Sequence, residues 1–213
     1  MDRRNFIAGA ATAVAGLSLP AIWRTDALAQ AGSKYYKGTS VDGGVQFRRT
    51  NFEAIDKRWH RQMVKYFSSE PQGTIVIDTR NHFLYWIWEN NTALRYGVGV
   101  GKEGFQWFGR ANVARKKRWP TWIPPEEMKK RSPNLPDRME GGPNNPLGPR
   151  ALYLHNGEGD TGYRVHGTTA PGSIGRDASS GCIRMFNEDA IDLYRRCPIG
   201  TAVLVLEHIA DRA

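Results

Sequence analysis

HGTTAPGSIGRDASSGCIR, residues 166–184, places a histidine and a cysteine at opposite ends of one turn-rich stretch. The histidine ends an apolar alternating run, Tyr163–Val165, which is typical of a β-strand. The cysteine, Cys182, directly follows Gly181. A strand that ends in a histidine, followed by a loop and a cysteine, is one way to bring a base close to a thiol.

These residue types suit nucleophilic catalysis. A cysteine reacts as its thiolate, and an unperturbed thiol has a pKa of about 8.5. We expect His166 to take the proton from Cys182. No acidic residue stands in an obvious place to orient the ring, so the backbone carbonyl of Gly167 is the nearest candidate. Taken singly, a cysteine of this kind is more often a small buried residue, and a histidine is more often structural.

The neighbours of the cysteine supply further candidates. Because Gly181 has no side chain, its backbone can approach a reacting carbonyl closely. We expect the amides of Gly181 and Cys182 to stabilise a developing oxyanion. Arg184 is expected to pair with a substrate carboxylate through its two-pronged guanidinium. Ser179 and Ser180 are expected to contact the substrate beside it.

The combined pattern resembles the signature of the L,D-transpeptidase catalytic domain, the YkuD family (ErfK/YbiS/YcfS/YnhG type). The matching segments are His166–Thr168 and Ser179–Arg184. Two upstream segments, Pro120–Pro125 and Asn145–Leu154, are also similar to parts of that family. The resemblance covers roughly Gln72 to Glu207, about two thirds of the chain.

The resemblance implies a nucleophile at Cys182 and a base at His166. It implies an acyl-enzyme made from a tetrapeptide stem of peptidoglycan, with loss of the terminal D-Ala and transfer of the acyl group to an amine of another stem. It implies peptidoglycan stem peptides as partners and no cofactor. One departure is Ser180, because many family members carry histidine there. This leaves the acceptor preference open.

Two other functions share these residues. With water or another amine as the acceptor, the same thiol would act as a carboxypeptidase, as a hydrolase of wall linkages, or in tethering proteins to the wall. A non-catalytic wall-binding protein could also keep the fold, although the intact His166 and Cys182 pair argues against it. These alternatives differ in whether the part of the site that binds the acceptor amine excludes water, and the sequence leaves both open.

The first 29 residues read as a twin-arginine export signal. Arg3 and Arg4 precede an apolar run, Ile7–Leu19, that is too short for a membrane span of about 20 residues. Ala27–Ala29 fits a small-x-small cleavage site, so we expect a periplasmic protein that starts near Gln30. An uncleaved anchor is the alternative. The net charge of +9 suggests an anionic partner of unspecified kind.

The chain has 213 residues and is 40% hydrophobic, which is enough for one core. After the export signal we divide it into an arm (30–71), a catalytic domain (72–207) and a tail (208–213). Residues 30–50 are rich in glycine, serine and lysine, which predicts a mobile stretch. Residues 51–67 are predicted to form an amphipathic helix that docks on the domain, with its stripe at Phe52, Ile55, Trp59, Met63 and Phe67.

The catalytic domain is predicted to be mainly β, a β-sandwich of mixed sheets with a few short helices. Strands are expected at 74–78, 83–88, 94–100, 151–154, 163–166 and 201–206. A short helix is expected at 124–129, and a second from Asn187 as N-cap to Pro198, with Ile191 and Tyr194 on its inner face. The loop Ser132–Pro149 is predicted to be a lid over the cleft.

Three other features of the chain suggest a different partner, a disulfide or a metal. The basic run Arg115–Trp119 could suggest nucleic acid, but the export signal argues against that partner and favours a solvated strand edge. Cys182 and Cys197 could form a disulfide, which would consume the nucleophile. His155, His166 and Cys182 could hold zinc, but the chain lacks paired metal-ligand spacings. No phosphate-binding loop is present, so no nucleotide is implied.

Overall fold

The structure is a computed structural model that describes residues 34–102 and 107–207. The predicted export signal, the expected start at Gln30 and the tail at 208–213 lie outside these residues. Within them, no helix combines the length and the apolar character needed to cross a membrane.

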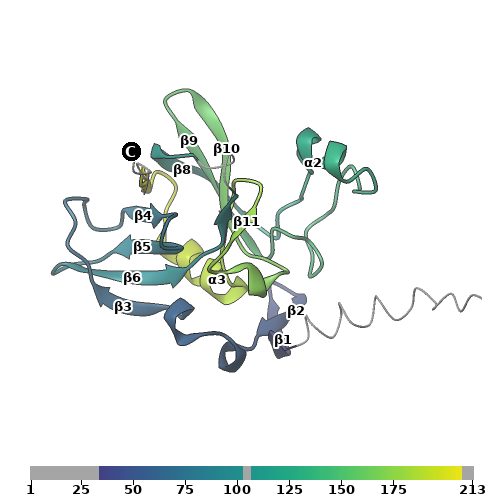
Figure 1. The fold of residues 1–213 in the computed structure, drawn as a ribbon, viewed down its shortest axis with the longest axis horizontal. Coiled ribbons are helices and arrows are strands. Elements are labelled where there is room, and N and C mark those ends of the chain that lie inside the picture. Colours follow the sequence, from purple (N-terminus) through teal and green to yellow (C-terminus); the bar gives the residue numbers. More distant parts are fainter. Residues whose placement is uncertain (1–33, 103–106, 208–213) are drawn as a thin grey trace, which may run out of the picture. The chain divides into compact units, whose positions relative to one another are not determined.

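One nine-stranded mixed sheet carries the fold (Figure 1). Its two parallel pairs are β10–β12 and β13–β4, and the other neighbours are antiparallel. This confirms the predicted mainly β fold with mixed sheets. In spatial order the strands are β12 (Ile183–Arg184), β10 (Gly159–His166), β9 (Arg150–Asn156), β8 (Gly109–Arg118), β13 (Ala202–Val205), β4 (Ile75–Asp78), β5 (Phe83–Ile87), β6 (Thr92–Gly97) and β3 (Gln62–Lys65).

Two small sheets and a few short helices complete the described fold. The hairpin strands β1 and β2 form one sheet, and β7 with β11 forms the other. The bounds are β1 (Tyr36–Asp42), β2 (Val45–Thr50), β7 (Val100–Gly101), β11 (Asp177–Ser179), α2 (Glu126–Arg131) and α3 (Asn187–Arg196), with 3-10 turns at Phe52–Ala54, Lys57–Trp59 and Pro171–Ser173.

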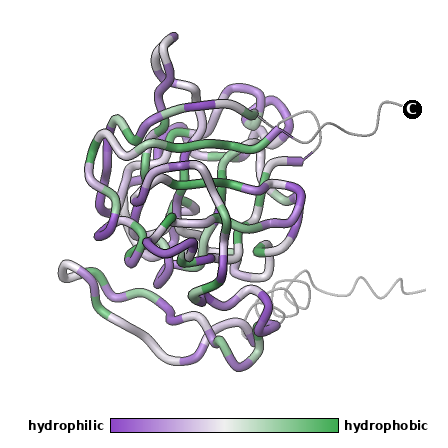
Figure 2. The backbone as a smooth tube through the Cα atoms, turned by 90° about the vertical axis from the view of Figure 1, so that its left-hand side faces the viewer, coloured by the Kyte–Doolittle hydropathy of each residue, from purple (hydrophilic) through white to green (hydrophobic). Residues whose placement is uncertain are grey.

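A single large hydrophobic core joins the two halves of the long sheet. It contains Ile75 and Leu84 from β4 and β5 together with Leu154 and Val165 from β9 and β10. Helix α3 adds Leu193 to the same cluster. Figure 2 shows hydrophobic stretches of the backbone gathered in the interior and hydrophilic stretches mainly at its outer turns. The sheet therefore closes around one core, as in a sandwich.

The predicted helix over residues 51–67 is wrong. The chain forms two 3-10 turns and then β3, which pairs with β6 through Met63↔Leu94 and Val64↔Ala93. Asp56 caps the second turn by accepting a hydrogen bond from the Arg58 amide, 2.9 Å. The free edge of β6 competes successfully with the helical pattern, because pairing satisfies a row of backbone groups. Only the first part of the stripe docks, and Met63 stays half exposed.

The predicted mobile stretch also differs, because residues 36–50 form the β1–β2 hairpin. Its turn residues Gly43 and Gly44 have φ of +59° and +82°, which glycine adopts without strain. The hairpin is anchored by Asp42, whose two carboxylate oxygens lie 2.7 Å from the two terminal nitrogens of Arg150. Asp42 also accepts from the indole of Trp119, 3.0 Å. The Arg150 guanidinium lowers the pKa of Asp42 below its usual value.

Helix α3 begins differently from the prediction, and its packing agrees with the prediction in part. Phe186 occupies the N-cap position, and the Asn187 side chain instead accepts a hydrogen bond from the Thr168 amide, 2.8 Å. The inner face is formed by Ala190, Leu193 and the following Cys197, with Tyr194 packed against them as predicted, whereas Ile191 is not part of this cluster. The Asn187 side chain therefore binds the loop after His166 and does not cap its own helix.

The Asp42–Arg150 pair yields a stability prediction. Asp42→Ala would leave the Arg150 charge, 4% exposed, without its partner, and should cost about 3–5 kcal/mol in the free energy of unfolding. Glu53→Ala is the matched control, because the Glu53–Lys37 pair is exposed and screened by solvent, so its loss should change stability little. Urea unfolding of both variants measures the difference. Equal, small losses would show that the hairpin is not held by this pair.

Candidate active site

The parallel pairing of β10 with β12 brings the strand end that carries His166 beside the segment that carries Cys182. The pairs are Val165↔Ile183 and His166↔Arg184. Cys182 precedes Ile183 by one residue, which places it beside Arg164 on the neighbouring strand. Residues 167–182 form the crossover that a parallel pair requires.

The crossover is fastened to the segment before β7. Gly99 and Arg184 exchange backbone hydrogen bonds of 2.9 and 2.8 Å. The Gly175 amide donates to the Val98 carbonyl, 2.9 Å, and β11 pairs with β7. These bonds hold both ends of the loop, so the position of Cys182 is set by the sheet rather than by the loop alone.

The ring of His166 is buried and held by its own chain. Its Nδ1 lies 2.6 Å from the Gly167 carbonyl oxygen, the contact expected from the sequence. Since a carbonyl can only accept, Nδ1 carries the proton and Nε2 remains an acceptor. Burial lowers the pKa of His166 to about 4, and the nearby charges of Arg184 and Arg164 act in the same direction. The ring is therefore neutral at pH 7.

The thiol is neutral as well. Burial raises the pKa of Cys182, although a backbone hydrogen bond from Arg164 and the charges of Arg164 and Arg184 oppose the shift. The resting site thus holds a thiol and an imidazole rather than a thiolate and an imidazolium. In such a pair the proton moves to the base as the sulfur attacks.

The expectation for the Gly181 amide needs correction. This amide donates to Oγ of Ser179, 3.1 Å, so it is occupied in this structure. The Ser179 hydroxyl in turn donates to the Cys182 carbonyl, 2.5 Å. Ser179 therefore shapes the turn around the cysteine. In the described part of the chain, the Cys182 amide makes no hydrogen bond and stays available.

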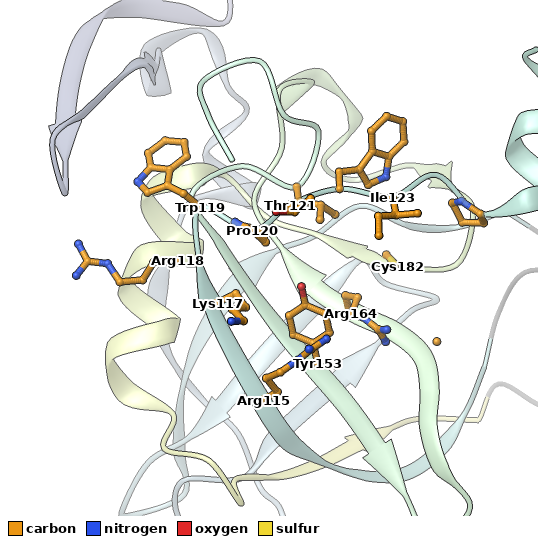
Figure 3. A pocket seen from close by; sticks show the side chains of 14 residues that line it. Arg115, Lys117, Arg118, Trp119, Pro120, Thr121, Ile123, Tyr153, Arg164 and Cys182 are labelled. Atoms are coloured by element: carbon orange, nitrogen blue, oxygen red, sulfur yellow. The ribbon is translucent and has the colours of Figure 1, made fainter. Parts of the chain in front are cut away.

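A cavity of about 580 Å³ opens beside Cys182 (Figure 3). Its floor is formed by side chains of β8, β9 and β10, and its opposite wall by the chain between Trp119 and Pro125. In Figure 3, Cys182 lies near one end of the cavity and Arg118 near the other. The lining residues are Arg115, Lys117, Arg118, Trp119, Pro120, Thr121, Trp122, Ile123, Pro125, Leu147, Tyr153, Gly162, Arg164 and Cys182.

Three predicted substrate residues do not line this cavity. Ser179 is buried in the turn, and Arg184 is half-buried with its backbone paired to Gly99. Ser180 is exposed, and its Oγ accepts a hydrogen bond from Nη2 of Arg131, 3.3 Å. Arg131 ends α2, so this contact links the helix that precedes the predicted lid to the turn before Cys182.

The wall opposite the floor is fixed by Asn145, which is 1% exposed. Its amide nitrogen donates to the carbonyls of Pro120, Met139 and Glu140 at 2.9, 3.1 and 3.1 Å. Trp122 and Met139 exchange two further backbone bonds of 2.8 Å. These bonds join the two ends of the segment that carries α2, beside the cavity wall.

The basic run is built into the site instead of forming a solvated edge. Residues 115–118 pair with β9, and Arg115 and Lys117 face the cavity. Lys116 points the other way and donates to the carbonyls of Tyr194 and Cys197, capping α3.

Arg164 and Tyr153 were missed as site residues, because their position depends on the register between strands. In a strand, residues two positions apart lie on the same face, so Arg164 shares a face with His166 and Tyr153 shares one with Ala151. This spacing was the only hint of their position that the sequence offered.

The structure places the two cysteines and the histidine considered for zinc apart from one another or without a shared partner set. Cys182 and Cys197 are both free, and Cys197 is buried behind α3. His155 lies 3.8 Å from Asp160 on the β9–β10 hairpin. Across residues 34–102 and 107–207, no group of three or more His, Cys, Asp or Glu is placed to hold a metal ion.

The family profile described as YkuD, L,D-transpeptidase catalytic domain, matches residues 72–205. The chain belongs to this family. The probable L,D-transpeptidase ErfK/SrfK of Escherichia coli K12 is 33% identical over 144 residues, which cover 64% of this chain and 44% of that protein. The chain therefore spans a little under half the length of this YkuD-family relative.

Solved structures give a second comparison. The Ldtfm–avibactam carbamoyl enzyme is 18% identical, with a TM-score of 0.50 over 65% of this chain and 50% of that chain, and it supports the fold alone. A Brucella melitensis protein described as a probable carnitine operon oxidoreductase is 48% identical, with a TM-score of 0.48 over 73% of this chain and 99% of that chain.

The glycine of the His-Gly-Thr motif has a packing reason. A Cβ on Gly167 would lie 2.4 Å from Oδ1 of Asn187 and 2.8 Å from Cδ of Pro149. Gly167→Ala should therefore cost about 1–3 kcal/mol in urea unfolding, as overpacking does. Gly157→Ala is the control, since nothing lies within 4 Å of its Cβ, and it should change stability by about 0.5 kcal/mol or less. Indistinguishable variants would remove this explanation.

The neutral pair yields a pH prediction. Alkylation of Cys182 by iodoacetamide should be slow at pH 6–8 and rise through pH 9, because the pKa of the thiol is raised. The measurement is the rate of mass increase in intact protein, with Cys182→Ala reporting any reaction at Cys197. A rate that reaches its plateau below pH 7 would instead reveal a preformed thiolate–imidazolium pair.

Proposed function

We propose that this protein is a peptidoglycan L,D-transpeptidase that works through a cysteine acyl-enzyme. The observation that supports this most directly is the placement of Cys182 at the cavity, beside the strand that ends in His166. Membership of the YkuD family supports the same reaction class. The substrates are tetrapeptide stems as donors and an amine of another stem as acceptor.

In the first step, Sγ of Cys182 attacks the carbonyl of the residue before the terminal D-Ala. Nε2 of His166 takes the thiol proton, which the Nδ1 contact to Gly167 leaves it free to accept. The C–N bond then breaks, and His166 gives the proton to the departing amine. Because the pKa of His166 is about 4, its protonated form is a strong enough acid for this transfer.

In the second step, an amine of another stem attacks the thioester. His166 removes a proton from that amine and returns it to the leaving sulfur. The Cys182 amide stabilises the oxyanion in both steps, and the Gly181 amide can add to it only after leaving Ser179. Water in place of the amine would release a tripeptide.

We also propose the setting of this reaction. The twin arginine at Arg3 and Arg4 and the following apolar run favour export, with a periplasmic mature protein that starts near Gln30. Peptidoglycan is met on that side of the membrane. N-terminal sequencing of the exported protein tests the start directly, and an intact Met1 would contradict it.

The proposed reaction is tested by mass spectrometry of products from a disaccharide-tetrapeptide. The wild type should give a dimer lighter than two monomers by one D-Ala. Cys182→Ala should give none, and His166→Gln should lower the rate by about 10²–10⁴-fold, since it removes the base. Tripeptide as the sole product would favour hydrolysis. Equal product from Cys182→Ala would defeat the mechanism.

A further inference from the structure

The cavity floor carries positive charge in an ordered array. On β8, Arg115 and Lys117 face the cavity. Register places Arg115 opposite Tyr153 and, one strand further, Arg164. Cys182 lies beyond Arg164, directly before β12. One row of side chains thus runs from Arg115 across the sheet to the nucleophile (Figure 3).

The charges in this row are not equivalent. Arg164 donates to both oxygens of Asp160, at 2.7 and 2.8 Å, so its charge is already balanced. Among the residues that the structure describes, neither Arg115 nor Lys117 forms an ion pair with a carboxylate, and no acidic side chain lines the cavity. Arg115 and Lys117 therefore face the cavity as uncompensated cations, and Arg118 lines its far end.

Arg115 is also held in place before any ligand arrives. Its guanidinium carbon lies 4.0 Å from the centre of the Tyr153 ring, and that of Arg164 lies 4.6 Å from the same ring. The tyrosine is thus contacted by both guanidinium groups, each in a cation–π contact. A guanidinium fixed in this way loses little conformational entropy when it binds a carboxylate.

The spacing fits a peptide that lies across the strands. Neighbouring strands are about 4.8 Å apart, so the backbones of β8 and β12 are separated by about 14 Å. Three extended residues span about 10 Å. The Arg115 side chain extends from β8 into the cavity and covers the remainder. The three residues on the acyl side of a tetrapeptide can therefore reach from Cys182 towards Arg115.

We propose that Arg115 and Lys117 form a carboxylate subsite for the donor peptide, binding an acidic group one or two residues before the acylated residue. This inference rests on the proposed function for the identity of the peptide, because the donor must stay bound while its terminal residue leaves. The subsite selects a donor with a free carboxylate over the same peptide with a carboxamide.

The test compares two synthetic tetrapeptides that differ only in carboxylate or carboxamide at the second residue. Binding to Cys182→Ala protein is measured by calorimetry, so that no turnover is needed. The acid peptide should bind about tenfold or more tightly, the usual scale of a charge-assisted hydrogen bond. Adding Arg115→Gln or Lys117→Gln should reduce this preference, and both together should remove it.

Lys65→Gln is the matched control, because Lys65 is exposed on β3 and carries the same charge. It should keep the full preference. Equal affinity for both peptides, no binding of either, or an equal loss with Lys65→Gln would overturn the subsite. Far-UV circular dichroism of each variant separates a lost subsite from a lost fold.

D-Ala release by wild-type protein without an acceptor separates the two proposals. Preferential binding of the acid peptide without D-Ala release would leave the subsite standing and defeat the proposed chemistry. D-Ala release at equal efficiency from both peptides would leave the chemistry standing and defeat the subsite. A preference that appears only when an acceptor peptide is added would assign the carboxylate to the acceptor, and would also overturn the proposal.

Discussion

The parallel pairing of β10 with β12 is the constraint on which the site depends. It sets His166 opposite Arg184 and brings Cys182 beside Arg164. A parallel pair cannot be closed by a short hairpin, so the chain must leave the sheet and return. The long crossover between histidine and cysteine is that excursion. Its backbone bonds to Gly99 and Val98 turn a flexible-looking sequence into a fixed support for the thiol.

Burial then decides the chemistry of the pair. Both reactive groups lose more from desolvation than they gain from their neighbours, so each rests in its neutral form. The arginines around them favour a thiolate but disfavour an imidazolium, which makes a resting ion pair costly. A neutral thiol is protected from unselective reaction, and it becomes a nucleophile only when a bound carbonyl lets Nε2 of His166 take its proton. The positive floor, led by Arg115, concerns binding rather than this proton transfer.

The sequence predicted what is local and missed what depends on register. Runs of β-branched, aromatic and other apolar residues around 75–78, 83–87 and 202–205 identified strands, because the side chains of these strands pack on both faces of the sheet. The apolar stripe at 51–67 has helical spacing, but residues 62–65 of this segment instead form a strand that pairs with the edge of β6. The occupied Gly181 amide follows from a serine hydroxyl two residues away, which spacing alone did not reveal. The row from Arg115 to Arg164 depends on the register of β8, β9 and β10, which the sequence does not specify.

The most direct test of the account is the intact mass of the protein after rapid mixing with a tetrapeptide stem and acid quench. The account predicts an added mass equal to the peptide minus D-Ala, located on the peptide fragment that contains Cys182. It also predicts that the adduct forms far more slowly in His166→Gln. Release of D-Ala with no protein-bound intermediate, or an adduct on another residue, would contradict a cysteine acyl-enzyme.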